Sequence, residues 1–258
     1  MRNTLHNIGA IAAKELKMLY GSPIAWVLMG LFAVLFGGFY NVFLSYFLQQ
    51  SMGSQFGGGG SSNVNATMIR PLLSNFSVLM LFLLPVVTMR TYSEEKRSGT
   101  IELLLTSPIT DLEIVLGKFL GAIGLYAGLL GVTVGYTALL FAFGTPDWRP
   151  ILSGYLGLLL MGTCFLAVGL FISSTTKNQM VAAAASFIAA LFMWIIGWFA
   201  ESAGPTFGAV LSYLSITSHI EDFSKGVIDT KHVVFYLSFI AFGLYLTLKS
   251  TDAERWRG

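Results

Sequence analysis

The feature that most constrains this chain is a set of six segments that contain no acidic or basic side chain. These segments cover residues 18–69, 71–89, 119–146, 150–176, 178–200 and 232–248. An ionised side chain near the centre of a bilayer costs about 2.5 to 3.5 kcal/mol, so charge-free segments of this length indicate membrane spans. Lipid admits only helices or closed barrels, and these segments lack the alternation of barrel strands. We therefore predict an all-α integral membrane protein.

We predict a single domain over residues 1–258 with six transmembrane helices. The expected spans are residues 23–48, 71–92, 111–143, 151–173, 179–200 and 231–249. Residues 49–68 are rich in Gly, Ser and Asn and are expected to form a flexible outer loop. The composition agrees, because 55% of the residues are hydrophobic and only 11% are charged, against about 25% charged in soluble domains. A net charge of +2 is too small to indicate a nucleic-acid partner.

Residues 1–22 precede the first span and have a different pattern. Apolar residues recur at helical spacing from Leu5 to Leu19, while Lys14 and Lys17 lie on another face. This pattern predicts a helix that lies at the membrane interface. A cleaved signal peptide is the alternative, but the first apolar run exceeds the usual core of about 7 to 15 residues.

The distribution of basic residues predicts the orientation. With both termini in the cytoplasm, eleven of the fifteen Lys and Arg residues lie on the inner side. Only Arg70, Arg149, Lys225 and Lys231 lie outside. The excess of basic residues in cytoplasmic loops therefore places both termini, and the segment between spans two and three, in the cytoplasm.

That inner segment, "SEEKRSGTIELLLTSPITDLEIVLGK" (residues 93–118), combines charge with an amphipathic pattern. Ile101, Leu104 and Leu105 share one helical face, and Pro108 ends the element. Residues 110–113 fit a capping box that starts the next helix before its membrane core. We expect a short helix that docks into a groove of a partner protein. A helix that rests on lipid headgroups needs the same pattern and stays open at this point.

Span three and the segment after span five carry two further patterns. Six glycines of span three recur at spacings of four and three, which predicts close helix packing, within the subunit or between subunits. They are Gly117, Gly121, Gly124, Gly128, Gly131 and Gly135. Residues 201–231 are too short for two more spans. They fit either short re-entrant helices or a solvated outer loop.

Several kinds of chemistry find no support in the sequence. The phosphate-binding pattern fails because Gly117-Lys118 is followed by Phe119, so nucleotide hydrolysis must come from another chain. Catalytic Ser or zinc-protease motifs are absent. The apolar cores hold no ionisable side chain, which disfavours an ion-coupled carrier. The single cysteine, Cys164, lies in an apolar run and is expected to serve packing.

The histidines give no cofactor site either. His6, His219 and His232 lie outside the apolar cores, which disfavours haem ligation. His219 and His232, with Glu221 and Asp222, match no specific ligand spacing. We therefore expect solvated loop residues there, no metal site and no cofactor in this chain.

At residues 89–119, "MRTYSEEKRSGTIELLLTSPITDLEIVLGKF", the sequence resembles the permeases of type-2 ATP-binding-cassette (ABC) exporters. Residues 219–242, "HIEDFSKGVIDTKHVVFYLSFIAF", resemble the segment that enters the last span in the gliding-motility-type branch of that family. Together with the six spans and the N-terminal helix, the resemblance covers nearly the whole chain.

The resemblance implies a six-span subunit, paired with a second copy or a related permease in the bacterial cytoplasmic membrane. Each subunit would dock on a cytoplasmic ABC ATPase, which holds ATP and Mg, and an accessory protein with an outer domain would be a further partner. Residues 93–110 would be the coupling loop. The residues that match the family's coupling element are Glu94, Glu95, Lys96, Arg97, Gly99, Thr100, Glu102, Leu103, Leu104 and Leu105.

The resemblance also implies that residues 202–229 would form short re-entrant outer helices. Spans two and five would line the pathway, with Phe76, Trp194 and Trp198 as candidates.

These observations predict the transmembrane subunit of an ATP-driven exporter with an unidentified substrate. An alternative is a membrane scaffold or mechanotransmitter that ATPase strokes drive against an outer partner without moving a substrate. An ion-coupled carrier is third, and it predicts transport that follows an ion gradient without ATP.

Overall fold

The computed structural model describes residues 2–57, 63–143 and 146–255, and all regular secondary structure in these ranges is helical. Six helical stretches in these ranges are long and apolar enough to cross a membrane, as predicted. They comprise α2 (Pro23–Gly57), α3 (Arg70–Thr88) with the preceding π-helix η1 (Asn65–Ile69), α6 (Asp111–Phe143), α7 (Trp148–Thr175), α8 (Gln179–Ser202) and α11 (Thr230–Arg255). The prediction of an all-α membrane protein is confirmed.

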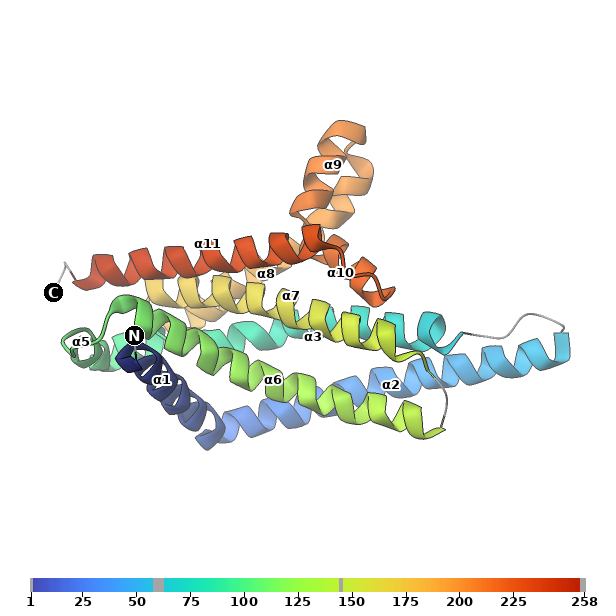
Figure 1. Cartoon of the computed structure of the whole chain (residues 1–258), viewed down its shortest axis with the longest axis horizontal. Helices are drawn as coiled ribbons and strands as arrows, with labels where there is room; N and C mark the ends of the chain where they lie inside the picture. Colours follow the sequence, from blue (N-terminus) through green and yellow to red (C-terminus); the bar gives the residue numbers. More distant parts are fainter. Residues whose placement is uncertain (1, 58–62, 144–145, 256–258) are drawn as a thin grey trace.

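The long helices lie side by side along the molecule, and α1 (Arg2–Gly21) crosses the start of α6 (Figure 1). Helix α7 is central, since it contacts α3, α6, α8 and α11. The start of α1 and the end of α11 lie at one end of the bundle (Figure 1). Helices α4 (Ser93–Ser98) and α5 (Thr100–Leu105) lie at the same end. This end carries the coupling segment, which we define as residues 93–110.

The first span is longer than predicted. Helix α2 continues through Gly57, although we expected a flexible loop from residue 49. A helix that has already formed gains one backbone hydrogen bond for each added residue, so polar residues without proline can extend it. The glycine-rich residues 58–62 of that expected loop lie outside the described ranges.

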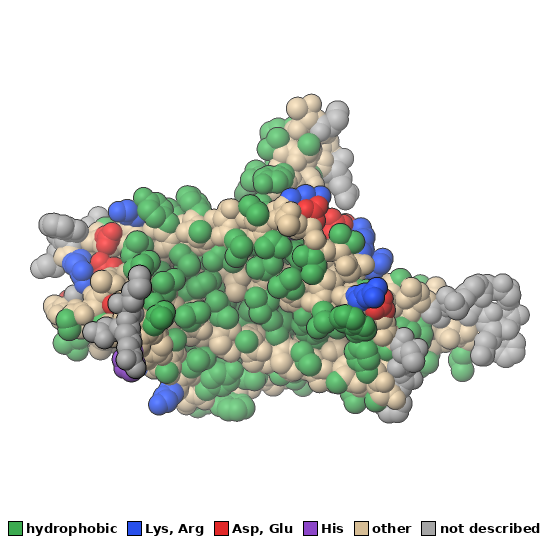
Figure 2. Space-filling view, in the orientation of Figure 1, with side chains coloured by type: hydrophobic (Ala, Val, Ile, Leu, Met, Phe, Trp, Pro, Cys, Tyr) green, Lys and Arg blue, Asp and Glu red, His purple; other side chains and the backbone are tan. Residues whose placement is uncertain are grey.

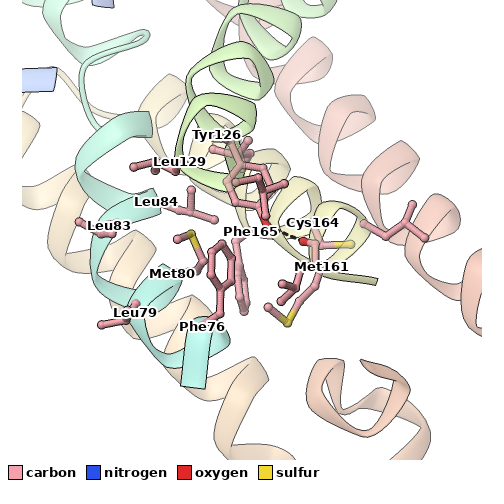
Figure 3. Packing of buried hydrophobic residues seen from close by; sticks show 14 of the residues in the cluster. Phe76, Leu79, Met80, Leu83, Leu84, Tyr126, Leu129, Met161, Cys164 and Phe165 are labelled. Atoms are coloured by element: carbon pink, nitrogen blue, oxygen red, sulfur yellow. Dashed lines mark hydrogen bonds between the residues drawn. The ribbon is translucent and has the colours of Figure 1, made fainter. Parts of the chain in front are cut away.

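The core lies between α3, α6 and α7, where apolar side chains of the three helices meet (Figure 3). The Tyr126 side chain of α6 extends across this core, and its hydroxyl donates a hydrogen bond of 2.5 Å to the carbonyl of Leu158 in α7. Its ring fits because Gly162 has no side chain, and a Cβ there would overlap the ring. Cys164 is fully buried in the same cluster, so its expected role in packing is confirmed.

Residues 201–231 contain two helices, α9 (Pro205–Leu214) and α10 (Ile216–Ser224), which we call the outer hairpin. Gly204 and Gly226 have φ of 76° and 90°, values that favour glycine, and they flank the outer hairpin. Helix α9 projects from the bundle, whereas α10 packs against α7 (Figure 1). The segment is therefore helical rather than an irregular loop. Whether the hairpin re-enters the membrane stays a prediction.

The surface has the polarity expected of a membrane protein. In Figure 2, hydrophobic side chains cover the middle of the visible face, and acidic and basic side chains gather toward its two ends. Such an apolar band between two charged ends suits a protein whose middle lies in lipid.

Candidate functional site: the charged end of the bundle

The coupling segment folds as two short helices rather than one. Helix α4 ends at Gly99, whose φ of 73° places it in the left-handed region, and α5 starts at once after it. A Cβ at Gly99 would meet nothing within 4 Å, so the backbone conformation, not the available space, requires glycine there. The turn lets α4 face the bundle while α5 projects from it at the end seen in Figure 1.

The predicted capping box at the end of the coupling segment is present. The backbone N–H of Thr110 donates to Glu113 Oε2 at 2.9 Å, and the N–H of Glu113 donates to Thr110 Oγ1 at 3.3 Å. This exchange satisfies two backbone donors that the first turn of α6 would otherwise leave free. Helix α6 begins at Asp111 for this reason.

Helix α4 is capped by a residue of α7 instead of one of its own. The Ser173 hydroxyl accepts hydrogen bonds from the N–H groups of Tyr92 and Ser93, both at 3.2 Å. The Ser93 hydroxyl in turn donates to the carbonyl of Ser173 at 3.1 Å. Since a free helix N-terminus has unsatisfied N–H groups, this contact joins the start of α4 to the end of α7.

Four charged side chains form a cluster between α1, α4 and α6, which we call the four-charge cluster: Lys14, Glu15, Glu95 and Lys118. The ammonium of Lys118 is fully buried and lies 2.8 Å from both Glu15 Oε1 and Glu95 Oε2. It also donates to the carbonyl of Thr91 at 2.9 Å, so hydrogen bonds to Glu15 and Thr91 and the ion pair with Glu95 surround the ammonium group. Lys14 lies 3.0 Å from Glu95 Oε1 at the solvent side. Two positive and two negative charges balance one another.

The electrostatics of Lys14 show how the cluster acts on its exposed member. Partial burial alone would lower the pKa of Lys14, but the carboxylates of Glu95 and Glu15 outweigh this and hold the pKa above its usual value. Lys14 therefore keeps its charge at neutral pH, and the cluster stays balanced.

Two more ion pairs attach the end of α11 to the same region. Lys96 pairs with Glu254 and also donates to the carbonyl of Ser174. Arg255 lies 3.1 Å from Asp111 at the start of α6. Helices α1, α6, α7 and α11 thus all contact the coupling segment or its boundary through polar groups.

The ten residues that match the family's coupling element divide into two sets. Glu95 and Lys96 are buried in the bundle, and Leu104 is half-buried. An outward face, which we call the exposed face, consists of Glu94, Arg97, Gly99, Thr100, Glu102 and Leu103. Leu103 leaves 73% of its side chain uncovered. The side chain of Leu105 lies outside the described residues.

The sequence reasoning missed Glu15 and Lys118 as partners of the coupling segment. A signal was present, since Glu15 lies among the apolar positions of the first helix, seven residues after Ile8 and four before Leu19. A carboxylate in an apolar stripe needs a buried partner. The sequence alone did not identify Lys118, which lies 103 residues away, as that partner.

The glycines of α6 divide in a similar way. A Cβ at Gly117, Gly121 or Gly124 would lie 2.5 or 2.6 Å from a side-chain atom of α1, and one at Gly128 would overlap Tyr20. The first four glycines therefore lie where α1 packs against α6. Gly131 and Gly135 meet nothing within 4 Å.

The three pathway candidates lie in different settings. Phe76 of α3 is buried inside the subunit and packs against Phe32 and Phe36. Trp194 and Trp198 of α8 pack against each other with ring centroids 4.8 Å apart, and Trp198 is exposed. The structure does not bring these three residues together, and their role in a pathway stays a prediction.

A second polar cluster lies at the opposite end of the bundle. His219 of α10 and His232 of α11 are only 4% and 5% exposed, so the expectation of solvated loop residues was wrong for them. Their Nδ1 atoms lie 2.6 Å apart, and His232 Nε2 lies 2.9 Å from Asp222 Oδ2. Phe235 of α11 packs on His219, and Phe223 of α10 packs on His232. No group of three metal-ligating side chains converges among the described residues.

The comparison with known proteins agrees with this arrangement. The family model described as "ABC-2 family transporter protein" matches residues 9–248. A curated relative, "Probable ABC transporter permease protein NosY" of Pseudomonas aeruginosa, is 30% identical over 138 residues, and the match covers 50% of each chain. The chain thus spans about half the length of this relative. With six candidate spans and a family match over most of its length, this multi-pass membrane protein belongs to the ABC-2 transporter family.

Proposed function

We propose that this chain is the permease subunit of an ATP-driven ABC exporter and that a separate cytoplasmic ATPase docks on the exposed face of the coupling segment. The observation that carries this proposal is the division of that segment. Its inner face is joined to four helices, whereas its outer face presents charged residues and a large uncovered leucine, Leu103. A surface of this kind suits a protein groove.

The exposed face has the chemistry of a docking surface. Glu94 and Arg97 lie one helical turn apart on α4, and Glu102 and Leu103 follow on α5. An apolar anchor within a charged rim is the usual anatomy of a protein interface. A helix at rest on lipid headgroups would instead direct Leu103 into the membrane, away from the charged end of the bundle.

The inner face supports transmission of movement. The four-charge cluster joins α4 to α1 and α6, Ser173 joins it to α7, and Lys96 joins it to α11. Because each contact is buried or charge-assisted, a force on the coupling segment moves several helix ends together rather than bending one loop. We propose that ATP binding and hydrolysis in the partner act through these contacts.

The remaining assignments extend the proposal. We place both termini in the cytoplasm and the chain in the bacterial inner membrane, in agreement with the distribution of basic residues. We also propose a dimer with a second permease in which spans two and five, α3 and α8, line the pathway at the dimer axis; α8 is largely uncovered over its spanning part. The resemblance of residues 219–242 to the gliding-motility-type branch suggests that an outer accessory protein takes part. ATP and Mg bind only in the partner ATPase.

The proposal is tested by Glu94→Lys and Leu103→Asp, made in the full chain and expressed with the ABC ATPase that copurifies with the unmodified chain. Both changes alter the exposed face and leave the four-charge cluster intact, so the chain should fold while copurification and stimulated ATP hydrolysis fall. Glu221→Lys is the matched control, since Glu221 is 69% exposed and lies at the opposite end. Unchanged copurification and unchanged hydrolysis in both variants would overturn the docking proposal.

A second measurement distinguishes an exporter from a scaffold and from an ion-coupled carrier. An exporter in liposomes shows ATPase activity that rises with a transported compound, and a lipid or peptide that copurifies with the chain is the first compound to test. A scaffold shows hydrolysis that depends on an outer partner and on no transported compound. An ion-coupled carrier shows transport with an ion gradient and no ATP.

A further inference from the structure

The buried histidine pair has a hydrogen-bond chain whose protons can be assigned from its partners. His219 Nε2 lies 2.8 Å from the carbonyl oxygen of Tyr213, which can only accept, so His219 Nε2 carries a proton. The two Nδ1 atoms face each other at 2.6 Å, so one proton lies between them. His232 Nε2 faces the Asp222 carboxylate at 2.9 Å and donates to it.

Only one proton count satisfies this chain of contacts. The two rings carry three N–H groups, one toward the Tyr213 carbonyl, one between the Nδ1 atoms and one toward Asp222, so the pair has one positive charge. One proton fewer leaves either two lone pairs facing each other or a lone pair against the carboxylate. With one additional proton, both rings are cations, and their two Nδ1–H groups face each other with the nitrogen atoms 2.6 Å apart. Both changes remove a hydrogen bond in a buried setting.

The surroundings favour this count. Burial lowers the pKa of His219; the Tyr213 carbonyl and Asp222 oppose this, whereas His232 and Lys231 add to it. The rings of Phe235 and Tyr213 pack on His219, with the Phe235 centroid 4.0 Å away. The Tyr236 hydroxyl of α11 donates a hydrogen bond to the carbonyl of Ile216.

The nearest other charges lie on α10, on the turn after it and at the start of α11. Lys225 lies 2.7 Å from Glu221 Oε1 and 3.8 Å from Oδ1 of Asp222 itself, and Asp229 before α11 pairs with Lys231. Arg149 at the start of α7 lies over Trp148, and Arg70 at the start of α3 acts on Lys225. Helix α8 has no ionisable side chain from Gln179 to Ala200.

We propose that His219, His232 and Asp222 form a proton-binding latch that holds the outer hairpin against α11 with one shared set of protons. The latch joins the end of α9 through Tyr213, the middle of α10 through His219 and the start of α11 through His232. It closes at intermediate pH, where one proton lies between the two Nδ1 atoms, and it opens when acid adds a proton to the pair or alkali removes one. The outer hairpin therefore responds to the pH on its side of the membrane.

Histidine ring NMR on the reconstituted full chain tests the proton assignment directly. Because the chain has only three histidines, His6→Gln leaves the signals of the pair alone. Near neutral pH we expect one neutral ring with its proton on Nε2 and one doubly protonated ring. Two neutral rings, or two rings that titrate independently like free histidine, would overturn the proposal.

A distance measurement tests the opening. Spin labels at Thr206 and Val234, both exposed, report the separation of α9 and α11 in a Cys164→Ala background. The short-distance population should be largest at intermediate pH and fall on both sides. His219→Phe, which keeps an aromatic ring beside Phe235, should abolish the fall of this population on the acid side. Asp222→Asn should shift its fall on the alkaline side to lower pH. His6→Gln is the control and should keep the fall on both sides.

A flat pH profile in the otherwise native labelled chain, or an unchanged fall on the acid side in His219→Phe, would contradict the latch. If His219→Phe does not fold, the NMR assignment and the Asp222→Asn profile still decide the proposal. The latch is independent of the proposed ATPase docking, because neither experiment contains a partner chain or ATP.

Discussion

The two ends of this helix bundle bury ionisable groups in different ways. At the charged end, Lys118 is fully buried between Glu15 and Glu95, and Lys14 completes a set of two positive and two negative side chains. At the opposite end, His219 and His232 share protons with Asp222. A balanced cluster of Lys and Glu keeps its contacts across physiological pH, whereas a histidine pair changes with small shifts in pH. The first suits a permanent joint and the second suits a switch.

The largest effect should come from Lys118→Met. This change leaves Glu15 and Glu95 buried without their shared cation, and breaking a buried ion pair costs about 3 to 5 kcal/mol. Lys17→Met is the matched control, because Lys17 lies exposed on α1 and has the same side chain. Unfolding of both variants in detergent micelles measures the difference. Equal loss of stability in the two variants would mean that the cluster does not hold α1 and α4.

A smaller effect is expected where glycines let helices approach at each end. Gly121→Ala places a Cβ 2.5 Å from Glu15 Cβ, and Gly157→Ala places one 2.8 Å from Phe223 of the outer hairpin. Such overpacking costs about 1 to 3 kcal/mol. Gly135→Ala meets nothing within 4 Å and should stabilise α6 by up to about 1 kcal/mol, since alanine favours helix.

Thermal unfolding of these three variants, with hydrogen exchange on α1 and α10, separates the two ends. Gly121→Ala should raise exchange mainly in α1, and Gly157→Ala mainly in α10. A destabilised Gly135→Ala variant would show that another surface covers that part of α6.

The smallest effect should come from the two serines that cap a helix at each end. Ser173→Ala removes the cap of α4, and Ser215→Ala removes the hydroxyl that accepts from the N–H of Ser218 in α10. Loss of a helix cap costs about 1 kcal/mol. Hydrogen exchange should rise in α4 for the first variant and in α10 for the second. Increased exchange in both helices from either single change would argue that the ends are not separate units.

Much of the fold could be predicted from the sequence because membrane spans depend on local composition. The charge-free segments predicted six helices, and the Thr110 and Glu113 pair predicted the start of α6. These signals are local, since each depends on residues within one helix or one turn. The prediction was wrong for residues 49–57, where α2 continues beyond its apolar part.

The candidate site could be predicted only in part. The coupling segment was located by its sequence pattern, but the pattern did not separate buried Glu95 from exposed Glu94, its neighbour. That separation depends on Lys118 and Lys14, which approach Glu95 from other helices. The histidines were expected to be solvated because their spacing matches no specific ligand pattern, and their contact joins positions 13 apart on two different helices.

The sequence by itself determined which segments enter the membrane, where charge is allowed and where helices start and stop. These properties follow from transfer free energies and backbone capping, which act over a few residues. The tertiary structure alone decided which charges are paired, which glycines carry a helix contact and which histidine nitrogens face each other. Those properties depend on side chains from distant helices that meet within about 3 Å, a range that hydrogen bonds and ion pairs require.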